Sequence, residues 1–497
     1  MNPTGLAAHL PALQVVLPLL AAPVCLLIGK PRFCWLLAFA VTLACFAISQ
    51  LLLGQVLESG TIHYAMGGWA PPWGIEYVID AASAYVLVIV TAIAAAVMPF
   101  AGQSVAREIK EERVPVFYTL FLLCLTGLAG MVVTGDAFNL FVFLEISSLS
   151  TYAIISLGRD RRSLTSAFQY LIMGTIGGTF VLVGVGLIYA ITGTLNMTDL
   201  AVRLPEAPQT RTLYTAFAFI AVGMGLKIAV FPLHLWLPNA YTYAPSAATV
   251  FIAGTATKVA VYALLRFVFG VLSTAIDFSA VPFREIFAVL GVAGLLSASA
   301  VAIFQDDVKR MLAYSSVAQL GYIIIGVSYG TTAGLTAGLL HLFNHALIKA
   351  SLFMAVGCVF YRLGSTHLDR FRGLARKMPF TFGAFVVAGL AIIGVPLTTG
   401  FVSKWYLVGA ALEAGHWLVV AIILIGSLMA VIYIWRVVEV AWFQEPDEAT
   451  RDVSEAPALM LAATWLLVFA NIWYGIRTQY TVGVAAEAAR TLMGGGS

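Results

Sequence analysis

Long apolar runs, separated by short stretches that contain charges, proline or glycine, repeat along the whole chain. Each run is long enough to cross a bilayer as a helix, which needs about 20 apolar residues. The predicted helices cover residues 10–29, 34–56, 80–101, 115–134, 137–157, 164–192, 212–238, 244–272, 283–304, 309–328, 331–361, 379–412, 417–443 and 457–476. The pattern therefore predicts an all-α polytopic membrane protein of about fourteen transmembrane helices, without a soluble domain.

The composition supports a membrane environment. Of the 497 residues, 61% are hydrophobic and 10% are charged, whereas soluble domains carry roughly 25% charged residues. A soluble fold of this length could not bury so much apolar surface. The net charge of +3 is too small to indicate a nucleic-acid partner. The five cysteines lie in or beside apolar runs without a C-x-x-C pair, so we expect no metal site and no cofactor.

Lysine and arginine are distributed unevenly between the two ends of the predicted helices. When the N-terminus is placed outside, most of the 27 Lys and Arg residues fall in the inner loops and only a few in the outer ones. This bias follows the positive-inside rule. It predicts an even number of crossings, with both termini on the outer, periplasmic side of a bacterial cytoplasmic membrane.

Five charged residues lie inside otherwise apolar runs. They are Glu145, Lys227, Lys258, Lys349 and Lys404. A charge near the centre of a bilayer costs at least about 2.5–3.5 kcal/mol on insertion scales. We therefore expect these side chains to face the interior of the helix bundle, where they pair with one another or contact internal water.

The chemistry of these residues suits proton transfer. Burial favours the neutral form of lysines and carboxyl groups alike, and an interacting pair exchanges protons when a neighbouring charge changes. His341, His345 and Lys349 recur at every fourth residue, so they lie on one helix face over about 12 Å. This spacing is typical of a water-bridged proton relay. A static buried ion pair, or a histidine that only links two helices, is the competing interpretation.

Two of the runs contain helix breakers close to a lysine. Lys227 is followed by Pro232, and Lys404 is preceded by Pro396 within the unusually long run 379–412. Proline inside a membrane helix frees backbone groups, which then need internal partners or water. Paired interrupted segments in the two halves of a chain indicate inverted repeats with an ion site near the middle of the membrane.

Two further features have a structural interpretation. The glycine-rich stretch from Gly174 to Gly186 predicts a close-packing helix surface rather than a phosphate-binding loop, because no strand precedes it. Asp80 lies at the end of a predicted helix, where we expect an interface residue rather than a member of a relay.

Four stretches of the sequence resemble the antiporter-like subunits of respiratory complex I and of Mrp-type cation/proton antiporters. They are KIAVFPLHLWLPNA (227–240), DDVKRMLAYSSVAQLG (306–321), HLFNHALIKA (341–350) and GVPLTTGFVSK (394–404). The resemblance extends over residues 75–443. It implies fourteen helices with two inverted five-helix repeats, at residues 115–272 (helices 4–8) and 283–443 (helices 9–13), in which helices 7 and 12 are broken. Residues 1–114 would form helices 1–3, and residues 444–497 would form helix 14 and the C-terminal tail.

The resemblance also assigns proton translocation to ionisable residues near the middle of the membrane. These residues are Glu145, Lys227, Lys258, His341, His345, Lys349 and Lys404, with His234 as a further candidate. Glu145 is expected to pair with Lys227, and Lys404 is expected to face the exit or the next subunit of a larger complex.

The sequence leaves several functions open. Asn239 and Tyr241 stand where many complex I members have an acidic residue and a histidine, which favours a D-type subunit of a monovalent cation/proton antiporter that acts on protons and on Na⁺ or K⁺. The alternative is a proton-pumping subunit of a complex I-like NADH-quinone oxidoreductase or a membrane hydrogenase. The chain shows no redox or hydrolytic chemistry of its own, and it lacks the long lateral helix of the largest complex I subunit. A scaffold subunit and an organic-solute transporter are the rivals from other classes.

Overall fold

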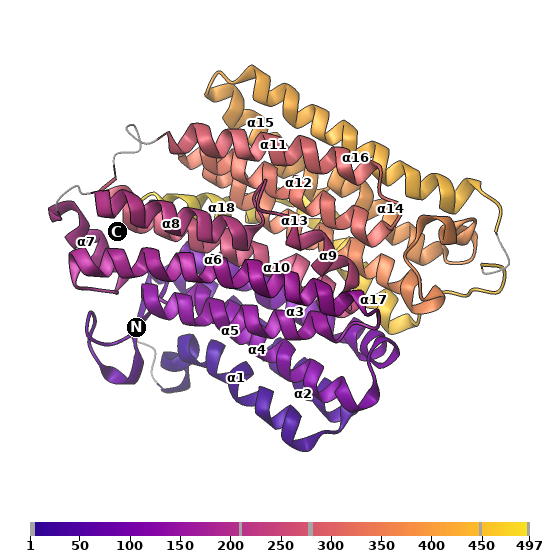
Figure 1. Cartoon of the computed structure of the whole chain (residues 1–497), viewed down its shortest axis with the longest axis horizontal. Coiled ribbons are helices and arrows are strands. Elements are labelled where there is room, and N and C mark those ends of the chain that lie inside the picture. Colours follow the sequence, from indigo (N-terminus) through magenta and orange to yellow (C-terminus); the bar gives the residue numbers. More distant parts are fainter. Residues whose placement is uncertain (1–4, 208–210, 277–281, 447–449, 495–497) are drawn as a thin grey trace.

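The computed structural model describes residues 5–207, 211–276, 282–446 and 450–494. Long helices run side by side through the whole molecule (Figure 1). The first six are α1 (Leu10–Ile28), α2 (Pro31–Ser59), α3 (Ala81–Glu108), α4 (Val114–Val133), α5 (Ala137–Ser156) and α6 (Arg162–Thr192). They are followed by α8 (Arg211–Ile228), α9 (Trp236–Tyr243), α10 (Ser246–Leu265), α11 (Phe283–Ile303), α12 (Val308–Ser328), α13 (Thr332–Leu363), α14 (Pro379–Ile393), α15 (Thr399–Glu413), α16 (Trp417–Phe443) and α17 (Ala458–Ile476).

The number of membrane crossings agrees with the sequence. Among the described residues, 13 helices are long and apolar enough to span a bilayer, and a fourteenth candidate is the bent pair Leu368–Arg376 and Pro379–Ile393. Helices α14 and α15 have 15 residues each, or about 22 Å, which is shorter than the hydrocarbon core of about 30 Å. We therefore count α14 and α15 together as one broken crossing. The prediction of about fourteen helices is confirmed.

The two predicted helix breaks are present. The first separates α8 from α9, and the second separates α14 from α15. Each break holds a non-glycine residue in the left-handed region, Ala229 with φ 64° and Leu397 with φ 72°, and no other described non-glycine residue has a positive φ. This conformation costs roughly 1–2 kcal/mol per residue. The left-handed residue interrupts the helix just beyond Lys227 in the first break and ahead of Lys404 in the second.

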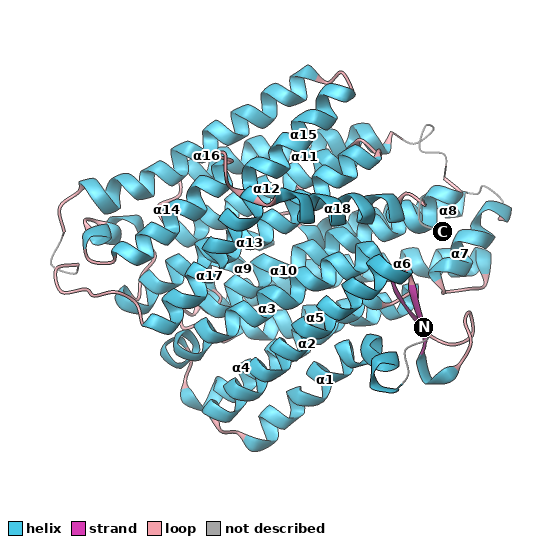
Figure 2. Cartoon of the chain, turned by 180° about the vertical axis from the view of Figure 1, so that it is seen from behind, coloured by secondary structure: helices cyan, strands magenta, loops and turns pink. Residues whose placement is uncertain are grey.

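Two strands and two α-helices lie outside the predicted helices. Strands β1 (Ile62–Ala65) and β2 (Glu76–Ile79) form an antiparallel hairpin within the polar connection before α3. Helices α7 (Met197–Arg203) and α18 (Thr478–Leu492) lie in the connection after α6 and in the C-terminal segment. Figure 2 shows the hairpin and both ends of the described chain at the same end of the bundle, as an even number of crossings requires.

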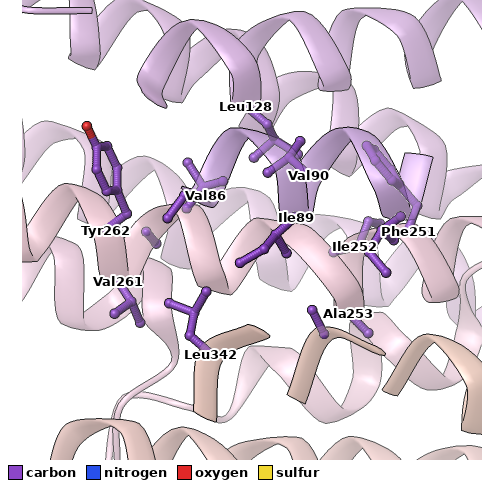
Figure 3. Close-up of a cluster of buried hydrophobic side chains, with 14 of the residues drawn as sticks. Val86, Ile89, Val90, Leu128, Phe251, Ile252, Ala253, Val261, Tyr262 and Leu342 are labelled. Carbon is purple, nitrogen blue, oxygen red and sulfur yellow. The ribbon is translucent and has the colours of Figure 1, made fainter. Parts of the chain in front are cut away.

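The helices differ in how deeply they are buried. Helices α10 and α12 are almost entirely enclosed by other helices, whereas most of α16 and α17 is exposed. Side chains of α3 and α10 interdigitate at the centre, where Ile89 and Val90 lie near Phe251 and Ile252 (Figure 3). The central helices α10 and α12 therefore provide water-poor positions inside the bundle.

Candidate functional site

The first polar cluster joins α5 and α8 at the break in the first half. The Lys227 ammonium lies 3.5 Å from Glu145 Oε1 and donates to Ser148 Oγ at 2.7 Å. It also lies 3.4 Å from the Tyr152 hydroxyl. The lysine side chain is 5% exposed and the carboxylate is 23% exposed. The predicted pair of Glu145 with Lys227 is thus present as a long contact. Two hydroxyl groups also bind the lysine and can replace the carboxylate as its hydrogen-bond partners.

Glycines of α6 make room for this cluster. A Cβ atom on Gly178 would lie 2.0 Å from Glu145 Oε1, and one on Gly174 would lie 1.8 Å from the Tyr152 hydroxyl. A Cβ atom on Gly177 would lie 3.6 Å from Cε of Lys227. The glycine-rich surface is therefore a close-packing surface, as predicted. Gly174 and Gly178 pack against the polar cluster, and Gly184 packs against Ile220 of α8.

Lys258 lies alone on the buried helix α10. Its side chain is fully buried, and its ammonium donates at 2.5 Å to the Ala253 carbonyl of its own helix. In the part of the chain that the structure describes, it forms no ion pair with a carboxylate. An isolated buried charge is expensive, and in the described structure the one partner of the Lys258 amine is this neutral carbonyl.

Two histidines of α13 continue the polar path into the second half. His341 lies between two partners, with Nδ1 2.9 Å from Ser403 Oγ and Nε2 3.0 Å from Gln319 Oε1. The His345 ring stacks 6.3 Å away, centroid to centroid. Both ring nitrogens of His345 are buried without a hydrogen-bond partner among the described residues. Buried polar atoms of this kind normally bind a protein group or an ordered water, so the two nitrogens of His345 are open to such a partner.

Lys349 is the third member of the relay predicted on this helix. It is fully buried, and its ammonium donates to the Leu312 carbonyl at 2.7 Å and to Ser315 Oγ at 2.8 Å. Ser315 Oγ in turn lies 3.1 Å from the Tyr433 hydroxyl. These partners are neutral, so they solvate the ammonium without fixing it in the charged state.

Lys404 closes the path at the second helix break. Its ammonium donates to the carbonyls of Ile392 and Ile393 at 3.0 and 2.9 Å, and to Ser427 Oγ at 2.9 Å. The two carbonyls end α14 and carry the negative end of its dipole. The ammonium also lies 4.8 Å from the centroid of the Tyr322 ring, within range of a cation–π interaction. Partial negative charges thus hold Lys404 without a carboxylate.

One broad face of α12 contacts Lys349, His341 and Lys404 in the second half of the chain. Its members are spaced by three or four residues, which places them on neighbouring turns. Leu312 and Ser315 contact Lys349, Gln319 contacts His341, and Tyr322 contacts Lys404. The sequence resemblance marks residues 306–321 as a motif, but it gives no role to Ser315, Gln319 or Tyr322.

Cavities lie at both ends of this face. At the end rich in lysine and arginine, a cavity of about 150 Å³ is lined by Glu108, Lys309 and Thr366, among others. Lys309 stands at the start of the predicted helix 309–328. It is buried and donates to the Ala244 carbonyl at 2.6 Å. At the opposite end, a cavity of about 610 Å³ is lined by Ile325 and Tyr329, one and two turns beyond Tyr322. The α12 face therefore leads from one cavity to the other.

Two further ionisable groups lie apart from the path. His234 is buried in the first helix break, where its ring stacks on Phe231 at 5.4 Å. Its Nδ1 atom is buried without a hydrogen-bond partner among the described residues. Asp80 caps α3 and forms a buried, two-bond ion pair with Arg266 at 2.6 and 2.8 Å. Burial raises the pKa of the Asp80 carboxyl, but Arg266 and Ser83 more than compensate and hold it below its ordinary value.

The chain is similar to known membrane subunits. Residues 134–430 match the family described as NADH:quinone oxidoreductase/Mrp antiporter, TM. The sequence is 43% identical to the NADH-quinone oxidoreductase subunit N of Desulforudis audaxviator (strain MP104C), over 97% of this chain and 99% of that protein. It is 29% identical to the D-type subunit of the Na(+)/H(+) antiporter of Alkalihalophilus pseudofirmus (strain ATCC BAA-2126 / JCM 17055 / OF4), over 88% and 89% of the two chains.

The fold is similar to that of a chain in a solved multisubunit complex. That complex is the membrane-bound sulfane sulfur reductase, described as an archaeal respiratory membrane complex. The TM-score is 0.90 with 32% sequence identity, and 98% of each chain is covered. The chain is therefore similar to subunits that work inside larger membrane assemblies.

Proposed function

Because the chain belongs to the NADH:quinone oxidoreductase/Mrp antiporter family of membrane subunits, we propose that its buried polar residues conduct protons across the membrane. The proposed path consists of Glu145, Lys227, Lys258, His341, His345, Lys349 and Lys404. The observation that carries the proposal is the chemistry of the partners. Apart from Glu145, the described partners of these lysines and histidines are neutral hydroxyl, amide, ring or carbonyl groups, so each group can gain or lose a proton in place.

The first half supplies the switch. When Glu145 is ionised, it attracts the Lys227 ammonium at 3.5 Å. When Glu145 is protonated, Ser148 and Tyr152 still solvate the ammonium, and its charge is free to act on the next group. Because like charges in a low-dielectric interior repel strongly, movement of this charge changes the proton affinity of Lys258.

The second half supplies the exit. Protons pass from Lys258 to the histidines and Lys349, and then to Lys404, with the α12 face as the common wall. The cavity of about 610 Å³ beyond Tyr322 is the proposed water-filled route out. The smaller cavity at Lys309 is the proposed access route from the opposite side. Among the described residues, no hydrogen bond or ring stacking links His234 to this path.

The repeats and the orientation belong to the same proposal. Residues 115–272 and 283–443 would form the two inverted repeats, flanked by residues 1–114 and 444–497. The matching breaks at Ala229 and Leu397, each close to a lysine, support this division. Both termini would lie on the outer side of a bacterial cytoplasmic membrane, because the loops at the opposite end hold most of the lysines and arginines.

Two energy sources are compatible with this site. Asn239 and Tyr241 favour a D-type subunit of a cation/proton antiporter that exchanges protons for Na⁺ or K⁺. The higher identity to subunit N of an NADH-quinone oxidoreductase, 43% against 29%, favours a proton-pumping module of a redox complex. In both versions the chain works with other membrane subunits.

Purification of the native complex through a tag on this chain distinguishes the two. Co-purification of iron–sulfur or flavin subunits, identified by mass spectrometry, supports the redox version. Co-purification of small membrane subunits and further antiporter-like chains alone supports the antiporter version. In that version a Na⁺ gradient drives proton movement in everted vesicles. A chain recovered with a soluble enzyme, and without any gradient-driven or electron-driven proton flux, would contradict both.

A further inference from the structure

A groove opens at the lysine- and arginine-rich end of the bundle, and none of its lining residues belongs to the buried polar path. It lies between the start of α2, the end of α3 and the start of α4, and the first turn of α17 closes one side. Its volume is about 650 Å³. The apolar part of the wall consists of Trp35, Leu36, Val114, Tyr118 and Leu459. Leu36 and Leu459 are 54% and 40% exposed, so the groove is open toward the lipid-facing surface.

Specific contacts hold the aromatic part of the wall in place. The Trp35 indole N–H donates to the Met98 carbonyl at 2.8 Å, which fixes the ring along α3. A Cβ atom on Gly102 would lie 2.8 Å from that indole nitrogen, so glycine is needed for the ring to approach. The result is a flat aromatic surface at the depth where aromatic side chains meet the headgroup region of a bilayer.

The mouth of the groove attracts negative charge. Arg32 lines it and forms no ion pair within the described part of the chain. Helix α2 begins at Pro31 without a side-chain cap, so its first free N–H groups and its dipole favour an anion at the same point. Lys30 is adjacent in sequence. Glu111 also lines the groove and opposes an anion. Its charge and that of the neighbouring Glu112 are balanced by the exposed Lys110 and Arg113 on either side of them.

One acceptor inside the groove lacks a donor. Gln103 Oε1 is a buried atom with no hydrogen-bond partner among the described residues, and Gln103 lines the groove. A buried amide oxygen of this kind normally binds a donor. The occupant should therefore carry an anionic group for Arg32, a hydroxyl or ammonium donor for Gln103, and an apolar portion for Trp35 and Leu36.

We propose that this groove is a binding site for an anionic glycerophospholipid with a hydroxyl-bearing headgroup, such as phosphatidylglycerol. The phosphate binds Arg32 and the N-terminus of α2, a headgroup hydroxyl donates to Gln103 Oε1, and one acyl chain lies against Trp35 and Leu36. Basic pockets between membrane helices at the inner surface bind anionic headgroups in the same way. A helix of a neighbouring subunit is the rival occupant, but its apolar side chains would leave Arg32 and Gln103 unpaired.

Native mass spectrometry of the purified full-length chain tests the proposal. The chain is exchanged into nanodiscs of equal parts phosphatidylglycerol and phosphatidylcholine, and the lipids retained after release are counted. We expect one tightly held phosphatidylglycerol on the unmodified chain, and at least a fivefold lower occupancy of that lipid in Arg32→Gln. The matched control is Arg372→Gln, which also removes one exposed arginine from the same end of the bundle but does not line the groove.

A second variant separates a specific site from general charge attraction. Gln103→Glu places a carboxylate beside the proposed phosphate, so it should lower phosphatidylglycerol retention while phosphatidylcholine retention stays unchanged. Equal losses in Arg32→Gln and Arg372→Gln would overturn the proposal. So would equal retention of the two lipids by the unmodified chain. Absence of the bound lipid in the intact complex, with a neighbouring helix crosslinked at residue 36, would assign the groove to a neighbouring protein instead.

Discussion

Gly178 of α6 leaves the space that the Glu145 carboxylate occupies, because a Cβ atom at this position would lie 2.0 Å from Oε1. The distance is far below any real contact between a carbon and an oxygen. The side of α6 that faces Lys227 is therefore shaped by the absence of side chains. The geometry of the pair depends on a residue that carries no charge and takes no part in proton transfer.

Substitution of this glycine should disturb the pair without removing either charge. In Gly178→Ala the carboxylate must move away from Lys227, and we expect the proton flux to fall about tenfold or more, since small displacements at a reacting group have effects of this size. The flux is measured in everted vesicles with a pH-sensitive dye. Gly186→Ala is the control on the same helix, because nothing lies within 4 Å of a Cβ atom there. Equal flux in both variants would mean that the position of Glu145 is unimportant.

Gln319 should act through His341. In Gln319→Leu the Nε2 atom of His341 loses its partner, and an unsatisfied buried group costs about 1–3 kcal/mol. We expect a lower thermal stability in detergent and a slower proton flux. Gln305→Leu is the control, since among the described residues the Gln305 side chain donates only to the Val301 carbonyl in the last turn of α11, at 3.1 Å. Lower stability with normal flux would make Gln319 a purely structural residue.

The ion pair of Asp80 with Arg266 should stabilise the end of the bundle opposite the groove. Removal of one partner from a buried pair typically costs about 3–5 kcal/mol, so Asp80→Asn should lower the melting temperature substantially. Asp160→Asn breaks the exposed pair with Arg162 and should cost no more than about 1 kcal/mol. Similar melting temperatures for the two variants would contradict this role of Asp80.

The same pair predicts a dependence on pH. The pKa of Asp80 is lower in the folded chain than its ordinary value, so its contribution to stability is present above the unfolded pKa of about 3.9. That contribution is lost as the pH falls through the lower, folded pKa. The difference in melting temperature between the unmodified chain and Asp80→Asn should stay constant from about pH 5 to 8 and shrink below about pH 4. A difference that shrinks toward alkaline pH would contradict the assignment.

Cysteine labelling tests the orientation and both cavities. Glu413 lines the larger cavity and Arg159 lines the smaller one. A membrane-impermeant maleimide should label Glu413→Cys from the outside of intact cells, and Arg159→Cys only in everted vesicles. The native cysteines are buried, which keeps the background low. The reverse pattern would place the termini inside and invert the proposed direction of the path.

Much of the fold could be predicted because the bilayer imposes one strong pattern. The helices predicted from the apolar runs match the observed helices closely. The two helix breaks were predicted from Pro232 and Pro396. The hairpin near Glu76 and helix α18 escaped prediction, because their segments are too short or too mixed in polarity to form a clear apolar run. The amphipathic face of α18 rests on small residues such as Ala485 and Ala488, which carry little hydrophobic signal.

The candidate site could be predicted in part, for a different physical reason. Charges such as Lys258 and Lys404 are conspicuous in an apolar helix. Their partners are not, because serine, tyrosine and glutamine are ordinary residues in any helix. Gln319 and Ser315 become functional candidates only when the bundle brings α12 against α13. Gly178 is the extreme case. It matters because it lacks a side chain and so leaves room for the Glu145 carboxylate, and a single sequence does not reveal this.

Proton flux through a Glu145 variant decides whether the buried polar residues conduct protons. Glu145→Gln keeps the size of the side chain and a hydrogen-bond acceptor for Lys227, but it removes the charge that the proposed switch needs. The measurement compares proton flux in everted vesicles with the amount of assembled complex in the same membranes. We predict normal assembly with flux reduced to background. Normal assembly with normal flux would contradict the proposed role of the pair.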